Sequence, residues 1–133
     1  MAATSSRKRP PFDTEVTNLA LQIANREVNG MAVLALGGRI VLGEETSALR
    51  KSVNGLLASG NKTIILNVDR VGYIDSAGLG MLVAIYRDAK LQGASLALCN
   101  LGSHFEGVMQ ITKLLTVFDT YKTEADALRS LVG

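Results

Sequence analysis

The chain has 133 residues and a hydrophobic content of 47%, enough for one domain with a single buried core. It contains no tryptophan and 5% aromatic residues, which argues against a stacking surface for single-stranded nucleic acid. The net charge of +2 depends on Arg7, Lys8 and Arg9, and without them the remainder carries about −1. We therefore expect no direct nucleic-acid partner, and the overall charge indicates no other partner class.

The same composition bounds the cellular compartment. Cys99 is the one cysteine, so the chain cannot form an internal disulfide. The basic residues near the N-terminus are not followed by the apolar segment of a signal peptide. No apolar run approaches the roughly 20 residues that span a bilayer. We expect a cytoplasmic protein without a membrane span.

Residues 1–17 are polar and include a Pro-Pro pair, which predicts a mobile N-terminal tail and places the domain at residues 18–133. Two strand-like runs follow, at residues 19–28 and 31–38. They are separated by Asn29-Gly30, a strong signal for a tight hairpin. We expect these runs to pair as the first two strands of the domain.

Helix and strand signals then alternate along the chain. The segment 43–60 has apolar residues at helical spacing, namely Leu49, Val53, Leu56 and Leu57. Residues 62–68 form an apolar run rich in β-branched residues, typical of a central strand covered on both faces. Residues 77–92 predict a second helix, with its apolar stripe at Leu79, Leu82, Val83 and Tyr86. Residues 94–99 predict another buried strand.

The C-terminal part adds two helices and a short strand. Ser103 and Glu106 have the spacing of a capping box, which predicts a third helix whose inner face carries Phe105, Val108, Ile111 and Leu115. Residues 117–121 predict an edge strand. Thr123 is expected to cap a last helix whose inner face carries Ala125, Leu128 and Leu131. The fold class is therefore α/β (α+β), a small mixed β-sheet with about four flanking helices.

The stretch YIDSAGLG, residues 73–80, lies at the junction between the central strand and the second helix. This puts Ser76 at or near the N-cap, where unpaired N–H groups and the helix dipole stabilise an anion. Gly78 and Gly80 carry no side chains, so we expect another molecule to approach the backbone closely there. The junction is the strongest candidate for a functional site.

Four interpretations of this junction are open on the residues alone. Ser76 and Asp75 could simply cap the helix. The glycines could belong to a phosphate-binding loop, although the lysine and third glycine of the known nucleotide loops are missing. Ser76 could be a nucleophile if His104, the one histidine, reached it. Ser76 could be a site of regulatory phosphorylation. Cys99 is expected to be a buried thiol, and no metal cluster is indicated.

The segment YIDSAGLGMLVAIYRDAKLQGASLALCN resembles the core of a STAS domain, specifically that of the bacterial anti-sigma-factor antagonists. The resemblance extends from about Leu19 to the C-terminus. It implies a non-enzymatic domain without a cofactor, which binds an anti-sigma-factor serine kinase and thereby frees the sigma factor. The kinase phosphorylates the motif serine, and a metal-dependent serine phosphatase reverses the modification.

The same resemblance assigns roles to individual residues. It makes Ser76 the phosphoacceptor, Asp75 the acidic neighbour that positions it, and the helix start a partner-binding surface formed by Gly78, Leu79 and Gly80. Ala77 replaces a second hydroxyl found in many members. Asn67 replaces an aspartate, which implies one charge fewer near the site. STAS domains also occur in anion transporters, stress-signalling assemblies and lipid-transport complexes, so an accessory role without phosphorylation is the alternative.

Overall fold

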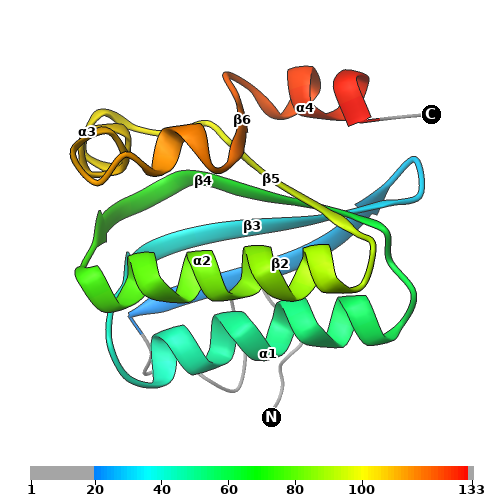
Figure 1. Ribbon diagram of the computed structural model, residues 1–133, viewed down its shortest axis with the longest axis horizontal. Helices are drawn as coiled ribbons and strands as arrows, with labels where there is room; N and C mark the ends of the chain where they lie inside the picture. The colour runs from blue at the N-terminus through cyan, green and yellow to red at the C-terminus, as the bar shows by residue number, and fades with distance from the viewer. Residues whose placement is uncertain (1–19, 132–133) are drawn as a thin grey trace, which may run out of the picture.

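A computed structural model describes residues 20–131 (Figure 1). The elements in chain order are β2 (Leu21–Val28), β3 (Met31–Ile40), α1 (Glu44–Ala58), β4 (Thr63–Ile74), α2 (Ser76–Leu91), β5 (Ser95–Cys99), α3 (Ser103–Ile111), the 3₁₀ turn η1 (Leu114–Thr116), β6 (Asp119–Tyr121) and α4 (Glu124–Leu131). The element order matches the one predicted from residue 19 onward. The expected tail, residues 1–17, lies outside the described residues.

The strands form one mixed sheet in the order β2-β3-β4-β5-β6. β2 and β3 are antiparallel, and the pairs β3–β4, β4–β5 and β5–β6 are parallel. Figure 1 shows α1 and α2 side by side on one face of the sheet and α4 on the other. The predicted fold class, a small mixed sheet with four flanking helices, is confirmed for the described residues.

The first two strands are joined by the predicted two-residue turn. Val28 pairs with Met31 across the hairpin, so only Asn29 and Gly30 lie in the loop. Their φ angles are 53° and 81°, as a type I′ turn requires, and asparagine and glycine tolerate that conformation best. This local chemistry sets the register of β2 on β3.

The core has two parts, one on each face of the sheet. The larger lies beneath α1 and α2 and includes Leu34, Leu66, Leu49 and Leu82. The smaller lies under α4 and joins Met31, Val33, Ile65 and Cys99 to Ala127. Because successive strand residues point to opposite faces, Ile64 and Ile65 of β4 contribute to different parts of the core. The apolar run at residues 62–68 is central for this reason.

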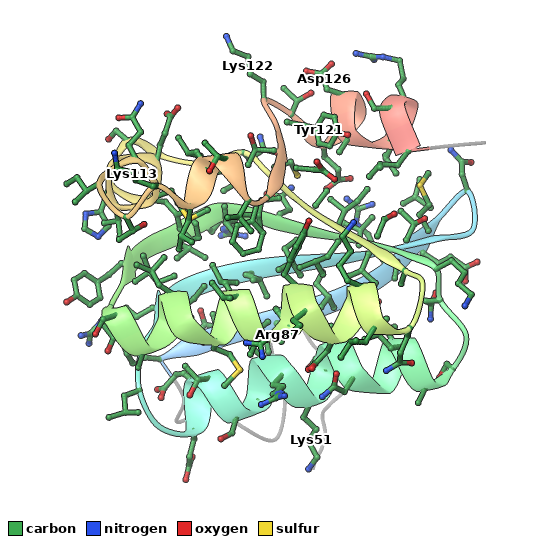
Figure 2. All side chains as sticks on the ribbon, viewed as in Figure 1. Lys51, Arg87, Lys113, Tyr121, Lys122 and Asp126 are labelled. Carbon is green, nitrogen blue, oxygen red and sulfur yellow. The ribbon has the colours of Figure 1, made fainter. Side chains whose placement is uncertain are left out.

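Charged side chains lie on the outer surfaces of both helix layers. Arg50 of α1 and Asp88 of α2 form an ion pair at 3.1 Å, which links the two helices at the surface. Figure 2 shows Lys51 pointing away from the sheet on one side of the molecule and Lys122 on the other. None of the described helices has the length and apolar character needed to cross a membrane.

Two expectations about the C-terminal helices are wrong in detail. The N-cap of α3 is Gly102, and no side chain caps this helix, so Ser103 and Glu106 form no capping box. Ile111 is 82% exposed, because α3 ends at that residue and its inner face is filled by Phe105 and Met109. In α4 the buried residue is Ala127 and Ala125 is exposed.

The cap of the last helix was predicted correctly. The Thr123 hydroxyl oxygen accepts a hydrogen bond from the Asp126 backbone N–H at 3.0 Å. Leu128 and Leu131 pack on the smaller part of the core, also as expected. α4 therefore closes the face of the sheet opposite α1 and α2.

Candidate functional site

The site is built where β4 ends and α2 begins. β4 continues well past the predicted run, to Ile74, and Asp75 keeps an extended conformation with φ −100° and ψ −178°. Ser76 is the first residue of α2. The predicted strand-to-helix junction is confirmed, and the capping residue is Asp75 rather than Ser76.

Asp75 holds this junction together through both carboxylate oxygens. Oδ1 accepts a hydrogen bond from the Gly78 N–H at 2.7 Å, which caps α2. Oδ2 accepts one from the Leu42 N–H at 3.1 Å, and the Asp75 N–H donates to the Ile40 carbonyl at 3.2 Å. The loop after β3 and the loop after β4 are therefore fastened to each other by one residue.

These bonds also determine the charge of Asp75. The hydrogen bond from Gly78 stabilises the carboxylate most; burial opposes ionisation, and the bond from Leu42 favours it. The net effect lowers the pKa of Asp75 below its usual value. Asp75 is thus an ionised cap at neutral pH, adjacent to Ser76.

Ser76 is exposed, and its hydroxyl makes no hydrogen bond to any residue that the structure describes. It lies in the first turn of a 16-residue helix, where the dipole is positive. Its oxygen is therefore accessible and lies where a negative charge is stabilised. The geometry suits a group that is modified rather than one fixed by its neighbours.

The three residues predicted to form the partner surface do not share one environment. Gly78 and Leu79 are buried, and Gly80 is exposed. A Cβ added at Gly78 would lie 2.3 Å from the Ile40 carbonyl oxygen, closer than real Cβ atoms come to any neighbour. The expectation that another molecule approaches the backbone at Gly78 is wrong, because β3 already occupies that space. At Gly80 an added Cβ meets nothing within 4 Å.

Two residues close to this junction, Tyr73 and Arg39, were not singled out in the sequence. Tyr73 is 42% exposed and pairs with Arg39 across β3 and β4. Its ring stacks on His104 of α3, with centroids 5.5 Å apart and planes 14° apart. The Arg39 guanidinium lies 5.4 Å from the same ring. The one indication in the sequence that Tyr73 faces outward was its position beside Ile74, which faces inward.

The nucleophile interpretation required His104 to act as a base for Ser76. Among the described residues no hydrogen bond joins these two side chains, and the His104 ring lies against Tyr73 instead. Within the same residues, His, Cys, Asp and Glu form no group of three or more that could hold a metal ion. Within the described part of the chain, His104 is therefore not placed as a base for Ser76.

Two surface hollows are present, and both lie away from Ser76. One, of about 300 Å³, is lined by residues of α3, η1 and β6, including Glu106, Thr120 and Lys122. The other, of about 290 Å³, is lined by residues around the β2–β3 hairpin and the end of α1, including Arg26 and Asn61. Neither is lined by Ser76 or Asp75, so Ser76 does not project into these hollows.

A comparison with protein families gives a match to the STAS domain over residues 22–127. The chain belongs to the STAS-domain family. The match begins within β2, continues through β3 to β6 and α1 to α3, and reaches into α4. The resemblance identified from the segment around Ser76 is confirmed.

Three similar proteins illustrate the relation. A curated relative from Bordetella bronchiseptica, classed by its name with the anti-sigma factor antagonists, is 24% identical over 98 residues, which is 74% of this chain and 84% of the relative. An anti-sigma factor antagonist from Mycobacterium paratuberculosis has a crystal structure that matches with a TM-score of 0.72 at 20% identity, covering 84% of this chain and 93% of the other. The Bacillus cell fate determinant SpoIIAA, solved in its phosphorylated form, matches with a TM-score of 0.64 at 22% identity, covering 84% and 99%.

The position of Asn67 in this STAS domain corrects one expectation. Its Nδ2 donates a hydrogen bond to Glu124 Oε1 of α4 at 2.9 Å, on the face of the sheet opposite α2. At about 3.3 Å per strand residue, Asn67 lies roughly 20 Å before the end of β4. It does not lie near Ser76, so its neutrality removes no charge from the site. Cys99 is buried, as predicted.

Proposed function

We propose that this STAS domain is an anti-sigma-factor antagonist whose Ser76 is phosphorylated by a partner serine kinase. One observation carries the proposal: an exposed serine without a hydrogen-bond partner among the described residues begins α2, beside an ionised aspartate that caps the helix. The names of the Bordetella and Mycobacterium proteins support the antagonist class. The Bacillus protein of the same fold was solved in a phosphorylated form.

The proposed switch is electrostatic and local. Phosphorylation adds about −1.5 to −2 charges at the start of α2, where the helix dipole favours an anion. It places that charge next to the Asp75 carboxylate, so the surface becomes strongly negative without a change in the helix cap. A partner that packs closely on the unmodified surface is then repelled. A metal-dependent serine phosphatase resets the cycle, which runs in the cytoplasm.

The site residues have distinct roles in this proposal. Ser76 accepts the phosphate, and Asp75 fixes its position through the bonds to Gly78 and Leu42. Gly80 is the exposed member of the predicted partner surface. Gly78 and Leu79 support the site indirectly, because they pack the first turn of α2 against β3 and the core. The protein itself performs no catalysis.

The alternative is an accessory STAS module of a stress-signalling, transporter or lipid-transport assembly, in which Ser76 is never modified. That function requires the surface around Ser76 only as a docking site. The two functions differ in whether a charge at residue 76 changes the set of bound proteins. A charge-mimicking variant therefore separates them.

The test is an affinity pull-down from the lysate of the source organism with wild-type, Ser76→Ala and Ser76→Asp baits, analysed by mass spectrometry. We expect wild type and Ser76→Ala to retain an anti-sigma-factor serine kinase and Ser76→Asp to lose it. In the presence of ATP, phosphate should appear on the wild type and be absent from Ser76→Ala. Ser76→Ala should remain folded, with a change of under about 1 kcal/mol, because Asp75 provides the cap.

Ser103 provides a matched control. It is also an exposed serine at the first residue of a helix, and its helix lacks a side-chain cap. Ser103→Asp adds the same charge at the start of α3 and should weaken kinase binding less than Ser76→Asp does, because residue 103 is not the phosphoacceptor. Transporter subunits among the captured proteins, or identical captures with Ser76→Asp and wild type, would contradict the proposed switch.

A further inference from the structure

Two residues with exposed apolar side chains lie beside Asp75, the residue before Ser76. Among the described residues the large exposed hydrophobics are Leu42, Tyr73, Leu91, Ile111 and Val117. Leu42 lies in the loop between β3 and α1, and its N–H donates to the Asp75 carboxylate. Tyr73 precedes Asp75 by two residues in extended backbone, so both side chains leave the strand on the same side, about 7 Å apart. Both hydrophobic residues are therefore held beside the residue that caps α2.

Both side chains are open to solvent. Leu42 is 75% exposed and Tyr73 is 42% exposed. Neither side chain is part of the hydrophobic core. Ile74, the residue after Tyr73, points into the core instead. A solvent-facing leucine and tyrosine close to an exposed serine gain free energy when a second molecule covers them.

Tyr73 is also held in place before any partner binds. His104 from α3 stacks on its ring at 5.5 Å, and Arg39 from β3 lies 5.4 Å from the ring centroid. Side chains from two other elements, α3 and β3, thus hold one aromatic side chain next to the site. A fixed aromatic ring loses little conformational entropy on binding, which is the property of interface residues that contribute most to affinity.

Ser76 cannot be presented as an extended peptide while α2 is intact. The Leu79 N–H is bonded to the Asp75 carbonyl and the Gly78 N–H to the Asp75 carboxylate, so the acceptor lies inside a closed helical turn. A kinase acting on it must therefore recognise the folded surface. To place the serine oxygen in line with a nucleotide phosphate, that kinase must cover the residues immediately around Ser76.

We propose that Leu42 and Tyr73 are the two specificity-determining anchors through which the serine kinase recognises this protein. The inference rests on the proposed phosphorylation of Ser76 and adds the means of recognition. The kinase presents two apolar hollows on either side of its catalytic site. Leu42 enters one, and the ring edge of Tyr73, held by His104 and Arg39, enters the other.

Leu91 makes the test a matched one. It is 79% exposed, close to the value of Leu42, and lies at the far end of α2. At 1.5 Å per helical residue that end is about 22 Å from Ser76. Leu42→Ser and Leu91→Ser therefore remove the same chemistry from two equally exposed positions, one beside the acceptor and one remote from it.

The measurement is a competition between full-length proteins for phosphorylation in an ATP-supplemented lysate of the source organism. Wild type and one variant are mixed in the same reaction, and intact mass spectrometry follows both. The ratio of their rates is then the ratio of kcat/KM, whatever the kinase concentration. Tyr73→Phe is included because it keeps the ring and the stack.

We expect Leu42→Ser and Tyr73→Ala each to be phosphorylated at least about tenfold more slowly than wild type, while Leu91→Ser and Tyr73→Phe match it. Raising the variant concentration should restore its rate, since KM rather than kcat is affected. Because Leu42 contributes nothing to the core, Leu42→Ser keeps the test valid even if Tyr73→Ala unfolds.

Equal rates for Leu42→Ser, Leu91→Ser and wild type would overturn the inference and leave the phosphorylation of Ser76 intact. The inference would also be overturned if Leu91→Ser were phosphorylated as slowly as Leu42→Ser. Loss of an exposed leucine would then slow phosphorylation wherever it lies. Absence of phosphate on wild type would contradict the proposed function itself, and the inference with it.

Discussion

A substitution at Gly78 tests how closely α2 packs on β3. The sequence pattern predicted that Gly78 is open to another molecule, whereas the structure buries it against Ile40. The substitution is Gly78→Ala, which adds a single Cβ atom. That atom would lie 2.3 Å from the Ile40 carbonyl oxygen, 2.9 Å from Ile40 Cγ2 and 2.9 Å from Ile74 Cγ1. The same carbonyl accepts the hydrogen bond from the Asp75 N–H. The added atom must therefore displace β3 from α2 and weaken that bond.

The expected cost follows from these contacts. Overpacking of this kind costs about 1 to 3 kcal/mol, and a weakened hydrogen bond adds about 0.5 to 1.5 kcal/mol. Replacing glycine by alanine in a helix returns up to about 1 kcal/mol. The net loss in the free energy of unfolding is about 1 to 3 kcal/mol. Gly80→Ala is the matched control, because no atom lies within 4 Å of its added Cβ.

The assay is urea unfolding of the two variants and wild type, followed by circular dichroism. We expect Gly80→Ala to be as stable as wild type or more stable by up to about 1 kcal/mol. Gly78→Ala should be less stable than Gly80→Ala by about 2 to 4 kcal/mol, combining the two effects above. If the two variants unfold at the same urea concentration, the close packing of α2 on β3 at Gly78 is refuted.

Two further predictions concern titratable groups. The pKa of Asp75 is lowered in the folded state, so its contribution to stability is present above its unfolded value of about 3.9 and is lost as the pH falls through the folded value. Asp75→Asn keeps an oxygen that can cap α2 but loses the charge and the acceptor for the Leu42 N–H, so it should be less stable than wild type at pH 7 by about 0.5 to 1.5 kcal/mol, the usual net worth of one hydrogen bond. This difference in stability should narrow toward pH 3 in thermal unfolding, and a constant difference would contradict the charged cap. Burial, with a smaller contribution from Glu124, raises the pKa of Cys99 to about 12, so the thiol should resist iodoacetamide at pH 8 in the folded protein and react fully in urea. Rapid labelling of the folded protein would show that this face of the sheet opens.

The order of strands and helices could be predicted because it depends on neighbouring residues. The turn at Asn29-Gly30, the apolar run of β4 and the spacing of Leu49 and Val53 in α1 each specify one element from local chemistry. The candidate site was found for the same reason. An aspartate and a serine between a strand and a helix both favour the N-cap position, and here Asp75 takes it.

The failures occurred where packing between distant segments decides the outcome. Ser103 and Glu106 had the spacing of a capping box, but Gly102 caps α3 without any side chain. Spacing alone cannot reveal whether a side-chain cap forms once the helix is packed. Asn67 was expected near Ser76, but β4 continues to Ile74, and Asn67 bonds to α4 on the opposite face. The length of a strand depends on its partners in the sheet.

The sequence by itself therefore determined the elements, the STAS-domain resemblance and the position of the candidate site at Ser76. Only the tertiary structure decided the surroundings of that residue. It buried Gly78 against Ile40, brought Leu42 to Asp75 across a separation of 33 residues, and stacked His104 on Tyr73. The reason is physical: caps and turns depend on residues a few positions apart, whereas these contacts exist only after the sheet has assembled and closed the intervening loops.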